Sequence, residues 1–171
     1  ALAFAGGAEG AFAYWSASYI QIQFDTLPRA GAFGTAAFAV GMAVGRFASS
    51  TLAGKLGLKS LIILSLSIGL AISGAIFIIN GLLALYVFLF MMGLSVACLW
   101  PSIQSLAGIE MDVDPTPLMI FLSCFGLPGF SSATLLMGII GDARGIQTGF
   151  IIVPLYLCLS LVLILVNRSK H

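Results

Sequence analysis

The stretch LLALYVFLFMMGLSVACLWPSIQSLAGI, residues 82–109, contains no charged side chain. A helix needs about 20 predominantly apolar residues to cross the hydrocarbon core of a bilayer. The apolar residues form continuous runs and do not alternate with polar ones, which favours a transmembrane helix over a strand of a membrane barrel. The stretch therefore predicts a helical membrane protein and sets the scale for dividing the rest of the chain.

The composition of the whole chain agrees with this prediction. Of the 171 residues, 60% are hydrophobic and 8% are charged, and the mean hydropathy is +1.14. A soluble domain carries about 25% charged residues, so this chain has too few to cover a surface that faces water. A soluble enzyme and a disordered tail are disfavoured. So is a nucleic-acid binder, because a net charge of +1 cannot neutralise a phosphate backbone.

Short polar breaks divide the chain into six predicted spans. They cover residues 1–24, 30–53, 60–79, 82–109, 117–140 and 147–166. The predicted fold class is all-α: a polytopic membrane protein in which residues 1–171 form a single six-helix bundle. Thr116 followed by Pro117 predicts an N-cap and the first residue of the fifth helix.

Lys and Arg residues predict how the bundle is oriented. An even number of spans puts both termini on one side of the membrane. That side receives Lys55, Lys59, Arg168 and Lys170, and the other side receives Arg29 and Arg144. The positive-inside rule then predicts cytoplasmic termini, in an inner or plasma membrane. Because the chain opens in the middle of an apolar pattern at Ala1, we expect it to be part of a longer protein.

Two charged residues fall inside the predicted spans, where a charge is costly and usually functional. They are Glu9 in the first span and Arg46 in the second. If these spans form an antiparallel hairpin that turns near Leu27, the two residues lie within about one helical turn of the same depth. They could form a buried pair or jointly bind a polar solute. In a transporter they could act as a coupling charge pair, whose protonation or pairing changes during transport. They could instead form a structural salt bridge, or Arg46 could extend toward the cytoplasmic face.

Aromatic and amide side chains are candidates to line a solute site. Tyr14 and Trp15 follow Glu9 in the first span, and Trp100 and Gln104 are four residues apart on one face of the fourth. Ring faces can stack on a polar solute and amides can bind its hydroxyl groups. An interfacial belt is the alternative for aromatic residues in a membrane helix, but Tyr14 and Trp15 lie deeper than such a belt.

Proline and glycine indicate two candidate hinges. Pro101 interrupts the fourth span, and the fifth span carries Gly126, Pro128 and Gly129. Proline frees a backbone carbonyl and kinks a helix, and such breaks can serve as hinges in a moving bundle. They are also simply common in membrane helices. The sequence Gly41-Met42-Ala43-Val44-Gly45 predicts a face of small residues for close helix packing.

Other kinds of chemistry find little support. Cys98, Cys124 and Cys158 lie inside apolar runs, and the single histidine is His171. The acidic stretch from Glu110 lacks the glycine and distal glutamate of a calcium loop. We therefore expect no metal site, no cofactor and no enzymatic activity.

These features together resemble the major facilitator superfamily, whose members are secondary transporters built from two six-helix halves. The stretch after Gly45-Arg46 resembles the cytoplasmic loop motif between the second and third helices of a half. Leu52, Lys55, Gly57 and Lys59 match this loop motif, whereas Gly54 stands where the family has an aspartate. Residues 126–129 resemble the glycine–proline motif of the fifth and eleventh helices.

Within this superfamily, residues 101–107 and 138–142 are similar to the fucose–galactose–glucose proton symporter group. The resemblance implies that the chain is the second half of such a transporter, comprising helices 7 to 12. It implies alternating access and a site for a small polar solute, such as a sugar, and for a proton. The missing partner would be an N-terminal six-helix half, supplied by the same gene, a split partner or a second copy. The alternative function is a non-transporting structural subunit of a larger membrane complex.

Overall fold

The computed structural model describes residues 1–111 and 114–166, and every regular element in these ranges is helical. The helices are α1 (Leu2–Phe24), α2 (Pro28–Leu56), α3 (Leu58–Ser73), the 3-10 helix η1 (Gly74–Phe77), α4 (Leu82–Val96), α5 (Leu99–Met111), α6 (Pro115–Arg144), α7 (Ile146–Gly149) and α8 (Ile152–Val166). The predicted all-α class is confirmed. Arg168 and Lys170, on which the predicted orientation partly depends, lie outside the described residues.

Five helical segments are long and apolar enough to cross a membrane, so the chain is a helical membrane protein. These segments are Pro28–Leu56, Leu58–Phe77, Leu82–Met111, Thr116–Arg144 and Ile146–Val166. Helix α1 has 23 residues but is not among them, since Glu9 and several glycine and glutamine residues lower its hydropathy. It is also the central helix, in contact with α2, α4, α5, α6 and α8. A helix that falls short of the hydropathy of a membrane span is thus packed among the other helices on several sides.

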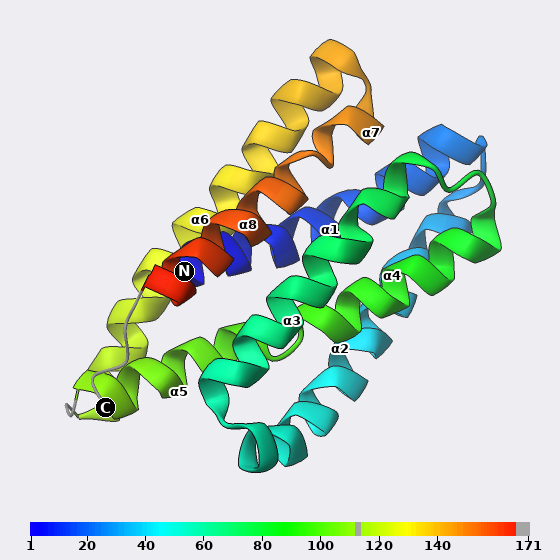
Figure 1. Ribbon diagram of the computed structural model, residues 1–171. Coiled ribbons are helices and arrows are strands. Elements are labelled where there is room, and N and C mark those ends of the chain that lie inside the picture. The colour runs from blue at the N-terminus through cyan, green and yellow to red at the C-terminus, as the bar shows by residue number, and fades with distance from the viewer. Residues whose placement is uncertain (112–113, 167–171) are drawn as a thin grey trace.

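The helices are arranged as two three-helix units of opposite direction. The first unit is α1, α2 and α3 with η1, and the second is α4 with α5, α6, and α7 with α8. Helices α1 and α4 begin at opposite ends of the bundle (Figure 1). The most extensive contacts join α1 to α6 and α2 to α4, and α3 packs on α8. Exchanging the two units maps these contacts between the units onto one another. The contacts within the units differ, since α1 packs on α2 far more extensively than α5 packs on α6.

Glycine residues allow the closest of these approaches. At Gly93 of α4, a side-chain β-carbon would collide with the carbonyl oxygen of Phe38 in α2, and at Gly41 of α2 with that of Phe90 in α4. At Gly129 of α6, it would collide with the backbone of Ala3 in α1. The predicted small-residue face at residues 41–45 is therefore confirmed as a packing face. Close backbone approach of this kind is how helices gain packing energy in lipid.

An aromatic cluster around Phe12 forms the centre of the core. The Phe12 ring lies 5.7 Å from that of Phe38, 5.9 Å from Phe88 and 5.4 Å from Phe150, measured between ring centroids. Phe12, Phe38 and Phe150 are all nearly inaccessible to solvent. The cluster links α1 to α2 in its own unit and to α4 and Phe150 in the other unit. The helix that carries Glu9, Tyr14 and Trp15 is therefore held from several sides.

The fourth predicted span is broken, but not at its proline. Helix α4 ends at Val96 and α5 begins at Leu99. Pro101 has no N–H to donate, and its ring clashes with the carbonyl group four residues earlier, which belongs to Ala97. The break therefore lies one turn before Pro101. In contrast, α6 continues without a break through Pro128.

The prediction that Thr116 caps the fifth helix is wrong. Helix α6 begins at Pro115, and the Asp114 carboxylate accepts a hydrogen bond from the Thr116 backbone N–H at 3.1 Å. Two cap-and-proline pairs, Asp114-Pro115 and Thr116-Pro117, follow each other in the sequence. The helix starts at the first pair, where an aspartate both caps and complements the positive end of the helix dipole.

This cap leads to a stability prediction. We expect Asp114→Ala to lower the free energy of unfolding by about 1 kcal/mol, because α6 loses its N-terminal acceptor. Thr116→Val, the matched control, should change it by less than about 0.5 kcal/mol. Denaturant titration of the two variants in detergent micelles measures both values. A larger loss for the Thr116 variant would contradict the assignment of the cap to Asp114.

Candidate functional site

The structure brings together the two charged residues that fall inside the predicted spans. Arg46 Nη2 of α2 lies 3.8 Å from Glu9 Oε1 of α1, with side-chain exposed fractions of 55% and 20%. This is the pairing that the hairpin of the first two helices predicted. At 3.8 Å the carboxylate and the guanidinium attract each other but form no hydrogen bond. Protonation or separation of the pair therefore breaks no hydrogen bond between them.

The exposure of Arg46 has a consequence for its surroundings. A guanidinium at the centre of a lipid-facing helix costs about 3 kcal/mol or more. Arg46 lies well inside α2, ten residues before the helix ends at Leu56. Contact of the exposed part of the Arg46 side chain with water or another protein element therefore costs less free energy than contact with lipid.

The main candidate site is a cavity of about 470 Å³ between α1 and α6. It is lined by Tyr14, Trp15, Phe130, Ser131, Thr134, Leu135, Gly138, Ile139 and Asp142. Tyr14 and Phe130 lie near the middle of their helices, whereas Asp142 lies in the last turn of α6. The cavity therefore extends from the middle of the bundle toward the end at which α6 ends.

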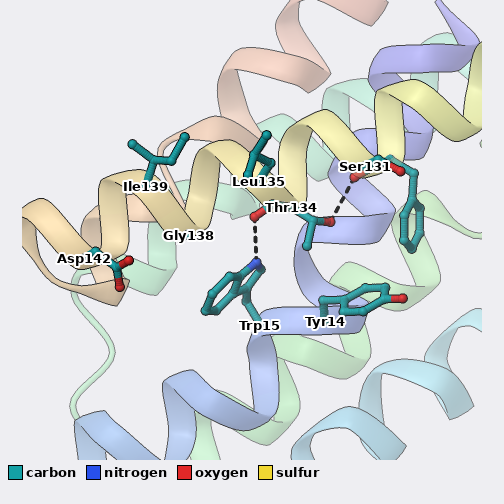
Figure 2. A pocket seen from close by; sticks show the side chains of 9 residues that line it. Tyr14, Trp15, Ser131, Thr134, Leu135, Gly138, Ile139 and Asp142 are labelled. Carbon is teal, nitrogen blue, oxygen red and sulfur yellow. Dashed lines mark hydrogen bonds between the residues drawn. The ribbon is translucent and has the colours of Figure 1, made fainter.

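Trp15 is held in a fixed orientation at this cavity. Its indole N–H donates to the carbonyl oxygen of Thr134 at 3.1 Å (Figure 2). A β-carbon added at Gly138 would lie 3.2 Å from Trp15 Cζ2, so the glycine leaves room beside the ring. Tyr14 packs edge-on against Phe130, with 5.6 Å between ring centroids, and is 65% exposed. Two aromatic surfaces thus border the space.

The other two predicted lining residues lie elsewhere. The Trp100 ring packs beside Gly6 of α1 and Gly126 of α6, and a β-carbon at Gly6 would lie 2.7 Å from Trp100 Cζ3. Gln104 donates from Nε2 to Ser123 Oγ at 3.1 Å and borders a separate cavity of about 280 Å³ between α5 and α6. The four residues therefore do not meet in one cavity.

Three polar residues of the main cavity are not among the residues predicted from the sequence. Ser131, Thr134 and Asp142 are spaced so that, together with Gly138, they occupy one face of α6. This spacing is visible in the sequence. It could have identified a polar face, but it does not indicate that α1 lies opposite.

The predicted loop motif joins α2 to α3. Gly57 is the single residue between the two helices and has φ = 78°, a conformation that favours glycine. Leu52 and Lys55 are exposed, and Lys59 is half-buried. The position of Gly57 thus has a structural explanation that is independent of any family.

No protein-family model, no curated protein and no solved structure matches this chain.

Proposed function

We propose that the chain is the C-terminal six-helix half of a secondary transporter of the major facilitator type, which moves a small polar solute with proton coupling. The observation that carries the proposal is the packing of two three-helix units of opposite direction. Inverted repeats of this kind are characteristic of secondary transporters, whose solute sites lie near the bilayer midplane.

The exposed surfaces of the two helices that flank α1 are evidence for a partner half that packs against them. Among the five membrane-length segments, α2 and α6 are the least buried. Arg46 is exposed on α2, and the main cavity is open beside α6. Polar surface on both flanking helices favours a protein partner or a water-filled cavity over lipid. We infer that an N-terminal six-helix half covers this side, in an inner or plasma membrane with the termini in the cytoplasm.

In the proposed mechanism, the main cavity holds the solute and Glu9 carries the proton. Solute and proton each bind one conformation of the transporter better than the other, and so shift the balance between inward-open and outward-open states. Protonation of Glu9 removes its attraction to Arg46 and frees α2 to move relative to α1. The break at Ala97 before Pro101, and the contact of Gly126 and Gly129 with neighbouring helices, are the proposed hinge points.

Solute counterflow in proteoliposomes tests the proposal. The complete protein, with any preceding half, is reconstituted with a high internal concentration of unlabelled solute, and entry of labelled solute is followed. We expect transient accumulation for at least one small polar solute and none in liposomes without protein. Absence of counterflow across a panel of sugars and amino sugars, with copurification of other subunits in fixed stoichiometry, would favour the structural-subunit alternative.

A further inference from the structure

The charge of the main cavity restricts the kind of solute that it can hold. Among the described residues that line it, Asp142 is the only one that carries a formal charge at neutral pH. Asp142 forms no ion pair with a described residue. Arg144 lies two residues further along α6 and therefore about 200° around the helix from Asp142, on the other side. The carboxylate is left to attract a positive charge from solution.

The end of α6 strengthens this attraction. Asp142 lies in the last turn of the helix, which ends at Arg144 with Gly145 as its C-cap. The carbonyl groups at a helix C-terminus carry a partial negative charge, equivalent to about half of an elementary charge. The carboxylate and the helix end thus favour a cation at the same mouth of the cavity and disfavour an anion.

The Trp15 ring provides a second surface for a cation. It borders Gly138, which is one helical turn, or about 6 Å, before Asp142 along α6. Side chains on a helix lean toward its N-terminus, so Asp142 leans toward the ring, and Figure 2 shows both side chains on the same side of α6. A cation within about 6 Å of an indole ring is attracted to its face.

We propose that this cavity binds a small solute that carries a protonated amine, with the ammonium group between the Asp142 carboxylate and the Trp15 ring. The remainder of the solute extends along Thr134 and Ser131 toward Tyr14, where hydroxyl groups of an amino sugar or amino alcohol find polar partners. The inference rests on the proposed function for its assignment of the cavity as the solute site. Beyond the proposed function, it specifies that the solute is positively charged.

Equilibrium binding of two matched sugars tests the inference. D-glucosamine and D-glucose are titrated into the complete protein in lipid nanodiscs at about pH 6, where a primary amine is protonated. We expect glucosamine to bind about tenfold or more tightly than glucose, since a charged hydrogen bond and a ring contact are gained. The Asp142→Asn variant should lose this preference and bind the two sugars alike.

Asp25→Asn is the matched control. Asp25 lies at the same end of the bundle, after α1, but outside the main cavity, and asparagine tolerates its positive φ of 46°. This variant should keep the preference for glucosamine. Size-exclusion chromatography establishes that both variants remain folded.

Three results would overturn the inference: equal affinity of the unmodified protein for both sugars, an unchanged preference in Asp142→Asn, or no binding of glucosamine at millimolar concentration. In each case, counterflow of a neutral solute would leave the proposed function intact. Failure of counterflow for every solute would contradict the proposed function itself.

Discussion

Replacing Gly93 with alanine is expected to lower the melting temperature of the purified protein by about 5 °C or more. A β-carbon at this position would collide with the Phe38 carbonyl oxygen of α2, and neither atom is the end of a flexible side chain. The backbones of α2 and α4 must therefore separate. Overpacking of this kind costs about 1–3 kcal/mol, which shifts the melting temperature of a protein of this size by several degrees. Thermal unfolding in detergent, followed by size-exclusion chromatography, measures the loss.

The chain supplies a matched pair of variants in a single helix. Gly41 of α2 faces the Phe90 backbone of α4, so Gly41→Ala should destabilise as Gly93→Ala does. Gly54 is in the same helix, but a β-carbon added there would have no neighbouring atom within 4 Å. Gly54→Ala should be neutral, or stabilising by up to about 1 kcal/mol through helix propensity. Equal melting temperatures for the Gly41 and Gly54 variants would contradict the packing described for α2 and α4.

Replacing Glu9 with glutamine is expected to reduce solute accumulation driven by a pH gradient strongly while counterflow continues. Glutamine preserves the shape of the side chain but cannot take up or release a proton. The gradient-driven accumulation ratio should therefore fall by about tenfold or more, a typical magnitude for lost coupling between two sites. Parallel uptake and counterflow assays in proteoliposomes distinguish this result from a general loss of transport.

Arg46→Gln tests the partner of the same pair. Arg46 contacts Glu9 at 3.8 Å, so its removal should weaken coupling while leaving Glu9 able to bind a proton. Glu110→Gln is the control, because it removes a charge at the far end of α5, away from the cavity. Unchanged accumulation in Glu9→Gln would rule out Glu9 as the proton carrier and leave the pair with a structural role.

The helix boundaries could be predicted closely where the sequence changes abruptly from apolar to polar. The first span, predicted over residues 1–24, is observed as Leu2–Phe24. Prediction failed where two signals compete within a few residues. Asp114-Pro115 and Thr116-Pro117 are both valid starts, and only the observed hydrogen bond from the Thr116 N–H to Asp114 distinguishes them.

The candidate site could be predicted only in part. The depth of two residues in a helical hairpin follows from the number of residues between them, so the Glu9–Arg46 pair could be predicted by counting. The grouping of Tyr14 and Trp15 with Thr134 and Asp142 could not, because these residues are more than one hundred positions apart in the sequence. Trp100 shares the chemistry of Trp15 but packs beside Gly6 and Gly126 instead.

The sequence by itself determined the helical membrane class, the approximate position of each helix and the small-residue faces that permit close packing. Apolar length and local breaks are enough for these features, because a backbone in lipid must satisfy its hydrogen bonds within each helix. Only the tertiary structure decided which helix is central and which side chains share a cavity. The apolar residues of α1 do not gather on one face, so its sequence carries no sign of which face meets protein and which meets lipid. The position of α1 at the centre, with Trp15 turned toward α6, is therefore a property of the assembled bundle.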